Sequence, residues 1–157
     1  MLTHLTIEGF IALKRVDIAL PDACTAVTGE TGAGKSMFVD AILFALGVKN
    51  KKNARIEANC RVSLACDLRD NTQAIDWMKT RGFPEHEDVL IQRFIDDKGR
   101  SRALLNGTPV MLQDLKALAS LLIQIHGQAA QFALTHEAAQ RDALDAFAGI
   151  EADARNV

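Results

Sequence analysis

One stretch of the sequence combines three glycines, a lysine and a serine in a pattern that can hold a phosphate chain. Residues 29–36 read GETGAGKS and match the phosphate-binding loop GxxxxGK[ST]. Glycines permit backbone angles that let consecutive N–H groups point at phosphate oxygens. The spacing places the Lys35 amine to reach the β- and γ-phosphates and the Ser36 hydroxyl to coordinate Mg²⁺. The residues assigned to a nucleoside triphosphate are Gly29, Glu30, Thr31, Gly32, Ala33, Gly34, Lys35 and Ser36.

The segments on either side of this loop have the patterns of a strand and a helix. Residues 25–28 (TAVT) form a short β-branched run, which predicts a strand that leads into the glycines. Over 35–46, Phe38, Ile42 and Leu46 recur at helical spacing, and Gly47 predicts the end of the helix. A helix that starts at the loop adds unpaired N–H donors and a partial positive charge, which favour an anion.

The rest of the chain reads as short strands and helices. Ahead of the loop, alternating apolar and polar residues predict strands over 2–7 and 16–20. After the loop helix we expect a strand over 61–68, a helix over 72–80, a hairpin with strands over 89–95 and 101–105, a helix over 112–118, a buried strand over 121–125 and a helix over 137–147. Arg93, Arg100 and Arg102 on the hairpin read as exposed charges of a strand face.

Hydrolysis of a triphosphate also needs a carboxylate that holds Mg²⁺ and a group that orients the attacking water. The nearest carboxylates, Asp96 and Asp97, follow a polar interruption at Gln92–Arg93 and lie in the hairpin, which favours two turn residues in solvent. Gln128 follows the apolar run 121–125 and carries both an acceptor and donors, so it can contact a metal and a water together. A catalytic role and an ordinary loop role both remain open for this glutamine.

Composition narrows the class of protein. The 157 residues are 48% hydrophobic and carry a formal net charge of −2, which argues against a wholly basic nucleic-acid binder. No apolar run approaches the roughly 20 residues of a membrane-spanning helix, and the N-terminus lacks the pattern of a secretion signal. The three cysteines have no CxxC spacing, so we expect neither a disulfide framework nor a zinc site, and a reducing cytosol fits best.

Five segments together resemble one family. They are MLTHLTIEGFIALKRVDIAL, TGETGAGKS, KGRSRALLNGTPV, LLIQIHGQ and QRDALDAFAG. In this combination they are similar to the N-terminal ATPase segment of the RecN family, bacterial DNA repair proteins related to SMC proteins. The likeness covers nearly the whole chain, and the GRSR, NG and HGQ elements make it more specific than the phosphate loop alone.

This resemblance implies an α/β fold of the P-loop NTPase type. The expected architecture is the N-terminal lobe of an ABC/SMC-type head, with a mixed sheet around the loop and an antiparallel β-subdomain. The lobe would span residues 1–148, and a helix over 137–157 would lead toward a coiled coil that is absent from this chain. The implied ligands are ATP and Mg²⁺. Lys35 and Gln128 would be the catalytic residues, Ser36 and Gln128 would contact the metal, and Arg55 would contact the nucleotide.

The implied function is ATP binding in an SMC-like ATPase that acts in DNA double-strand break repair and recombination, with ATP driving engagement of two heads. The implied partners are the C-terminal head lobe, a second head in a homodimer, and DNA, with no membrane; the implied location is the cytoplasm, in association with the nucleoid. In that family the Mg²⁺-holding Asp, the catalytic Glu and the signature helix lie in a C-terminal half, so we expect this chain alone to bind ATP without turnover. Alternative hypotheses are a small P-loop phosphotransferase, and a non-catalytic module for nucleotide-dependent dimerisation or DNA binding.

Overall fold

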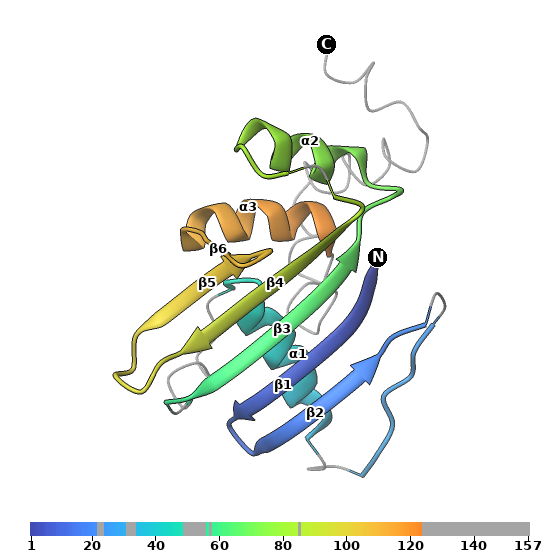
Figure 1. Ribbon diagram of the computed structural model, residues 1–157. Helices are drawn as coiled ribbons and strands as arrows, with labels where there is room; N and C mark the ends of the chain where they lie inside the picture. The colour runs from blue at the N-terminus through green and yellow to red at the C-terminus, as the bar shows by residue number, and fades with distance from the viewer. Residues whose placement is uncertain (22–23, 31–33, 49–55, 57, 85, 124–157) are drawn as a thin grey trace, which may run out of the picture. The chain divides into compact units, whose positions relative to one another are not determined.

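The structure is a computed structural model that describes residues 1–21, 24–30, 34–48, 56, 58–84 and 86–123 (Figure 1). Within these residues the backbone forms one six-stranded sheet in the order β2-β1-β3-β4-β5-β6. Every neighbouring pair in this order is antiparallel. The strands are β1 (Leu2–Phe10), β2 (Leu13–Ala19), β3 (Cys60–Asp67), β4 (Asp88–Ile95), β5 (Ser101–Leu105) and β6 (Thr108–Pro109).

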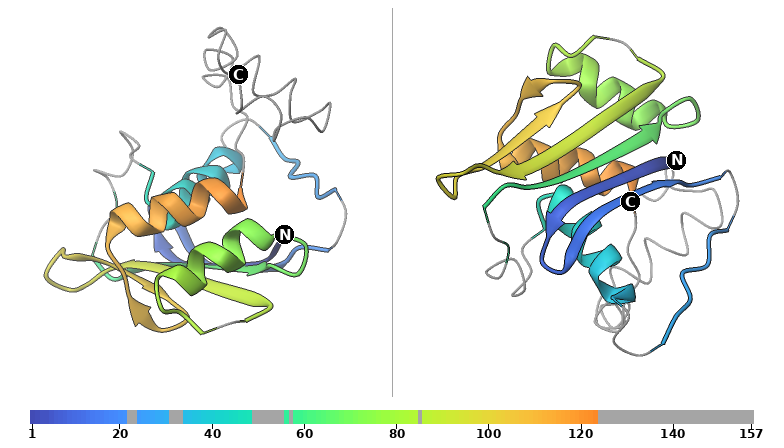
Figure 2. Two further views of the ribbon diagram at one scale, coloured as in Figure 1. Left: turned by 90° about the horizontal axis from the view of Figure 1, so that it is seen from above. Right: turned by 60° about the horizontal axis from the view of Figure 1, so that its bottom comes forward.

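Three helices complete the described part of the chain: α1 (Lys35–Ala45), α2 (Thr72–Thr80) and α3 (Leu112–Leu122). Figure 2 shows α1 and α3 on the same face of the sheet, and α2 packs against α3. The helix α1 runs against β3 and β4 in the middle of the sheet. The apolar core therefore lies between the central strands and this layer of helices.

The two faces of the sheet differ because side chains alternate along each strand. On β3 the side chains of Cys60, Val62 and Leu64 are fully buried, whereas Arg61 between them is exposed. The same alternation buries Ile7 on β1 and Ile91 on β4. An antiparallel sheet that covers one face with helices and leaves the other face to solvent has this pattern.

Most of the expected elements are present in the described residues. The hairpin strands, the helix over 72–80 and the first two strands are confirmed, with β1 and β2 longer than predicted. The Asn71 side chain begins α2 by accepting a hydrogen bond from the N–H of Ala74 at 3.0 Å. The expected helix over 137–147, like all of 124–157, lies outside the described residues.

Two of the expected strands are absent from the described residues. Residues 25–28 are not in a strand but in exposed, irregular backbone, because within the described residues no strand pairs with them. The apolar run from residue 121 does not begin a strand either, because α3 continues through Leu122. Leu115, Leu118 and Ala119 are buried on one side of α3, and the Asn71 amide donates to the Leu121 carbonyl at 2.8 Å. These contacts hold the last turn of the helix against the β3–α2 connection.

Replacing Gly47 with alanine is expected to destabilise the fold more than the same change at Gly82. Both glycines follow a helix with left-handed backbone, φ +78° and +77°, so each alanine costs about 1 kcal/mol in conformation. A Cβ at Gly47 would also lie 2.9 Å from Leu112 Cδ1, whereas Gly82 has open space around it. We therefore expect Gly47→Ala to lose a further 1–3 kcal/mol, roughly, in the free energy of unfolding.

Urea denaturation of the two variants and the parent chain measures this difference. Equal losses for Gly47→Ala and Gly82→Ala would show that α3 does not pack tightly on the end of α1.

Candidate nucleotide-binding site

The glycine loop ends at the first turn of α1. Gly34 precedes the helix in a left-handed conformation, φ 91° and ψ 9°, and no described side chain caps the helix start. An alanine here would be strained, and its Cβ would lie 2.9 Å from the Met37 methyl carbon. The first N–H groups of α1 consequently have no side-chain partner and carry the positive end of the helix dipole.

Lys35, the first residue of α1, folds its side chain back over the loop. Its ammonium group donates hydrogen bonds to the carbonyl oxygens of Gly29 and Glu30, the latter at 2.6 Å. The next residue, Ser36, is exposed to solvent. A cation, a hydroxyl and a helix start without a side-chain cap thus lie together, which are the groups that bind phosphate and its metal.

Five of the residues predicted for this site lie outside the described part of the chain. They are Thr31, Gly32, Ala33, Arg55 and Gln128. The described residues Gly29, Glu30, Gly34, Lys35 and Ser36 are those that the structure brings together. The roles of all ten in binding stay predictions.

The chain leading into the loop is exposed, and so is one side of α1. Residues 24–30 are all exposed, with Val27 at 52% of its full accessibility. On α1, Ala41 and Phe44 are buried against the sheet while Val39 is 46% exposed. A helix with apolar residues on several sides is typical of a buried helix. The surface formed by residues 24–30 and the exposed side of α1 is therefore largely apolar, as protein interiors are.

The opposite end of α1 is held by a residue that the sequence analysis placed incorrectly. Arg93 on β4 is not an exposed charge but is only 9% exposed, and it donates to the Phe44 carbonyl at 2.7 Å. The alternation along β4 indicates that Arg93 is buried, because it shares one face of the strand with the apolar residues Val89 and Ile91. Arg102 on the neighbouring strand is exposed as expected.

Both hairpin carboxylates follow β4 as predicted, but only Asp97 is exposed to solvent, whereas the Asp96 side chain is 16% exposed. Asp96 accepts from the N–H groups of Lys98 and Arg100 and from the Arg100 guanidinium at 2.8 Å. These hydrogen bonds, above all the one from the Arg100 backbone, hold the pKa of Asp96 below its usual value. Asp96 is therefore engaged in closing its own turn.

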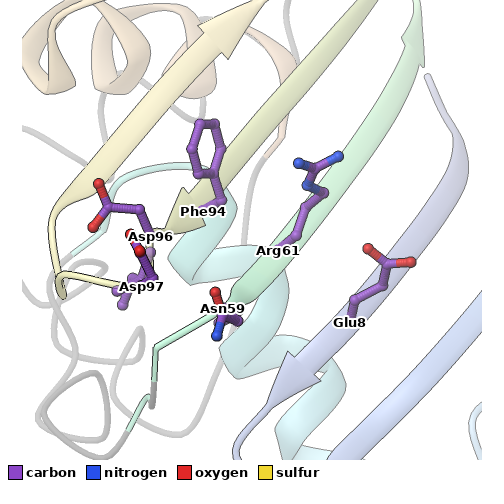
Figure 3. Close-up of a pocket in the computed structure, with 8 residues that line it drawn as sticks. Glu8, Asn59, Arg61, Phe94, Asp96 and Asp97 are labelled. Atoms are coloured by element: carbon purple, nitrogen blue, oxygen red, sulfur yellow. The ribbon is translucent and has the colours of Figure 1, made fainter.

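A cavity of about 380 Å³ lies beside this turn, and its labelled lining residues come from β1, β3, β4 and the hairpin (Figure 3). Arg61 projects there with its guanidinium 5.5 Å from the centre of the Phe94 ring, and Glu8 lies across the strand pair from Arg61. Figure 3 shows α1 behind the strands that carry these side chains. The cavity thus belongs to the solvent face of the sheet.

The described helices contain no segment long and apolar enough to span a membrane.

Comparison with known proteins places this geometry in a family. Residues 1–126 match the model of the RecF/RecN/SMC N terminal domain. The chain belongs to this family. It is 38% identical over 151 residues to the DNA repair protein RecN of Vibrio cholerae, and 33% identical over 153 residues to that of Haemophilus influenzae. These alignments cover 95% and 94% of this chain and 27% of each relative, so the chain spans about a quarter of the relatives' length.

Solved structures agree on the fold. The Smc head domain with a coiled coil and joint from Pyrococcus yayanosii is 24% identical, with a TM-score of 0.70 over 98% of this chain and 33% of that one. A chain from a study of ATP-driven dimerization and DNA stimulated activation of SMC ATPases gives 0.62 at 24% identity, over 92% of this chain and 97% of that one. The α/β fold class and the N-terminal lobe of an SMC-type head are thereby confirmed.

Thiol reactivity is expected to separate the three cysteines. Cys24 is exposed in the segment that leads into the loop, whereas Cys60 and Cys66 are buried. Burial raises the pKa of each buried thiol to about 11, so at pH 8 only about one in a thousand is the reactive thiolate. We expect iodoacetamide at pH 8 to alkylate Cys24 alone in the folded chain, and all three cysteines in urea.

Mass spectrometry of the intact alkylated chain counts the modified thiols, and peptide mapping assigns them. Rapid modification of Cys60 under native conditions would contradict the packing of α1 on β3.

Proposed function

We propose that this chain is the ATP-binding lobe of an SMC-like ATPase that acts in DNA double-strand break repair and recombination. The observation that carries the proposal is the start of α1. The residue before the helix, Gly34, provides no side-chain cap, and Lys35 bonds back to the loop. Membership of the RecF/RecN/SMC family supports the same assignment and argues against a small phosphotransferase. The names of the RecN relatives support a role in DNA repair.

The described residues fit ATP and Mg²⁺. The left-handed glycine at position 34 lets the backbone approach phosphate closely, and amides at the start of the helix, which no described side chain caps, would donate to its oxygens. The Lys35 ammonium would move from the loop carbonyls to the phosphate chain, because an anion is the stronger acceptor. The Ser36 hydroxyl would hold Mg²⁺, which supplies neutralising charge on the phosphates when bound. Arg55 and Gln128 are proposed as further ligands on the basis of the family resemblance.

The exposed segment and the apolar side of α1 support a C-terminal head lobe as the first partner. Residues 25–28 have strand-forming side chains without a strand partner among the described residues, and Val27 and Val39 are about half exposed. A second lobe that adds strands beside 25–28 and packs on α1 would satisfy both. Because that lobe would bring the metal-holding and catalytic carboxylates, the chain alone would bind ATP without turning it over.

The engaged ATPase would be a homodimer of heads with DNA as a further partner. One of the similar structures comes from a study of ATP-driven dimerization and DNA stimulated activation of SMC ATPases, and this chain would take part in the same kind of assembly. Its place would be the cytoplasm, in association with the nucleoid.

Replacing Lys35 with alanine is expected to weaken nucleotide binding to the chain by about 10- to 100-fold. The change removes hydrogen bonds from a charged donor to phosphate, each worth about 1.5–3 kcal/mol. Titration with a fluorescent ATP analogue in the presence of Mg²⁺ measures the effect. Lys98→Ala is the matched control, because Lys98 is an exposed lysine in the hairpin turn and removes the same charge elsewhere.

ATP turnover is expected only when the C-terminal lobe is added. We expect the chain alone to release phosphate no faster than buffer, and the mixture of lobes to hydrolyse ATP in a manner that Lys35→Ala abolishes. Steady-state phosphate release measures both. Mg²⁺-dependent turnover by the isolated chain would overturn the assignment of the catalytic carboxylates to another lobe.

A further inference from the structure

Arg93 is a buried cation in the described part of the chain that the proposed phosphate contacts do not use. It is 9% exposed, and the described residues give it no carboxylate within salt-bridge distance. The nearby Cys60 thiol stays neutral because burial raises its pKa to about 11. Burying a charge without an opposite charge is costly, so this arginine needs a local reason.

The contacts of Arg93 converge on one residue of α1. One terminal nitrogen, Nη1, donates to the Phe44 carbonyl at 2.7 Å, and the guanidinium carbon lies 4.3 Å from the centre of the Phe44 ring. The Nε atom donates to the Ser101 hydroxyl on β5 at 3.1 Å. The guanidinium therefore ties the last turn of α1 to the adjacent strands β4 and β5.

The position of Arg93 also suits the electrostatics of α1. The carbonyl groups at the end of a helix are unpaired and carry its negative end, where a cation is favourable. The last turn of α1 contains no basic residue of its own, so the charge comes from the sheet. Phe44 O also accepts from the N–H of Gly47 at 3.0 Å, which occupies its second lone pair. The Phe44 carbonyl thus accepts two hydrogen bonds, one from the chain after the helix and one from the sheet.

Among the described residues, no side chain of the sheet donates to the other end of α1 as Arg93 does to the Phe44 end. Its first turn lacks a side-chain cap, and Ser36 is exposed. At 1.5 Å per residue, the 11 residues of α1 span about 16 Å. A tilt of about 5° at the Phe44 end would move the first turn by about 1.4 Å, which exceeds the distance tolerance of a hydrogen bond. The accuracy of the phosphate-binding end therefore depends on how the far end is held.

We propose that Arg93 is a positioning residue for the nucleotide site: it fixes the angle of α1 on the sheet, and so the placement of the phosphate-binding turn. This inference rests on the proposed ATP binding at residues 29–36. Replacing buried ionic groups with apolar side chains of similar volume is often neutral or stabilising, so stability alone does not require arginine here. The planar fork of the guanidinium, which bonds Phe44 and Ser101 together, supplies direction as well as charge.

The test compares ATP affinity with stability in the 157-residue chain. The variants are Arg93→Met, which keeps the volume without charge, Arg93→Lys, which keeps the charge without the fork, and Ser101→Ala, which removes one partner. Arg102→Met is the matched control, since Arg102 lies on the next strand with its side chain 56% exposed. Binding of a fluorescent ATP analogue is measured at a temperature where circular dichroism shows each variant folded.

We expect Arg93→Met to weaken ATP binding about tenfold while folded, Arg93→Lys and Ser101→Ala to weaken it about threefold, and Arg102→Met to leave it unchanged. A purely structural role predicts a lower Tm with an unchanged Kd in every folded variant, and that result would overturn the inference. If Arg93→Met does not fold, unchanged affinity in both Arg93→Lys and Ser101→Ala overturns it equally. Failure of the parent chain to bind ATP would instead reject the proposed function itself.

Discussion

The seating of α1 on the sheet is the interaction on which the rest of the lobe depends. The Phe44 ring lies 5.6 Å from the ring of Phe10 and 4.3 Å from the Arg93 guanidinium, so residues of β1 and β4 hold it together. Fully buried residues of β3, including Cys60 and Val62, lie in the core on the strand between them. No described side chain caps the first turn of α1, whereas the Arg93 guanidinium bonds its last turn.

This arrangement explains why a polar side chain lies in the core. An apolar residue in place of Arg93 could fill the same volume, but it could not donate to a carbonyl at a helix end and to a hydroxyl on another strand. Burial lowers the pKa of Arg93, yet a guanidinium stays charged at neutral pH. The core thus contains a charged side chain, and its hydrogen bonds connect α1 with β4 and β5.

The described lobe has one surface with the character of an interior. The segment 24–30 is exposed although its side chains favour a strand, and α1 is apolar on the side that the sheet does not cover. The solvent face of the sheet is different, because Glu8, Arg61 and Gln92 alternate there with the buried residues. The exposed apolar residues of 24–30 and α1 therefore differ in character from the polar solvent face of the sheet.

Local sequence determined the parts of this protein that depend on neighbouring residues alone. The start of α1 at Lys35, the helix over 72–80 and the 89–105 hairpin follow from glycine conformations, capping and alternation within a few residues. The family could be inferred in the same way, since GETGAGKS and the GRSR and HGQ elements are continuous in the chain.

Only the tertiary structure decided the rest. Whether residues 25–28 form a strand depends on a partner strand, and the length of α3 depends on contacts with Asn71, which is 50 residues away. The alternation along β4 places Arg93 on the face of Val89 and Ile91, but its bond to the Phe44 carbonyl depends on α1 lying over that position. These features involve groups distant in sequence, and their energies arise only when the chain has folded.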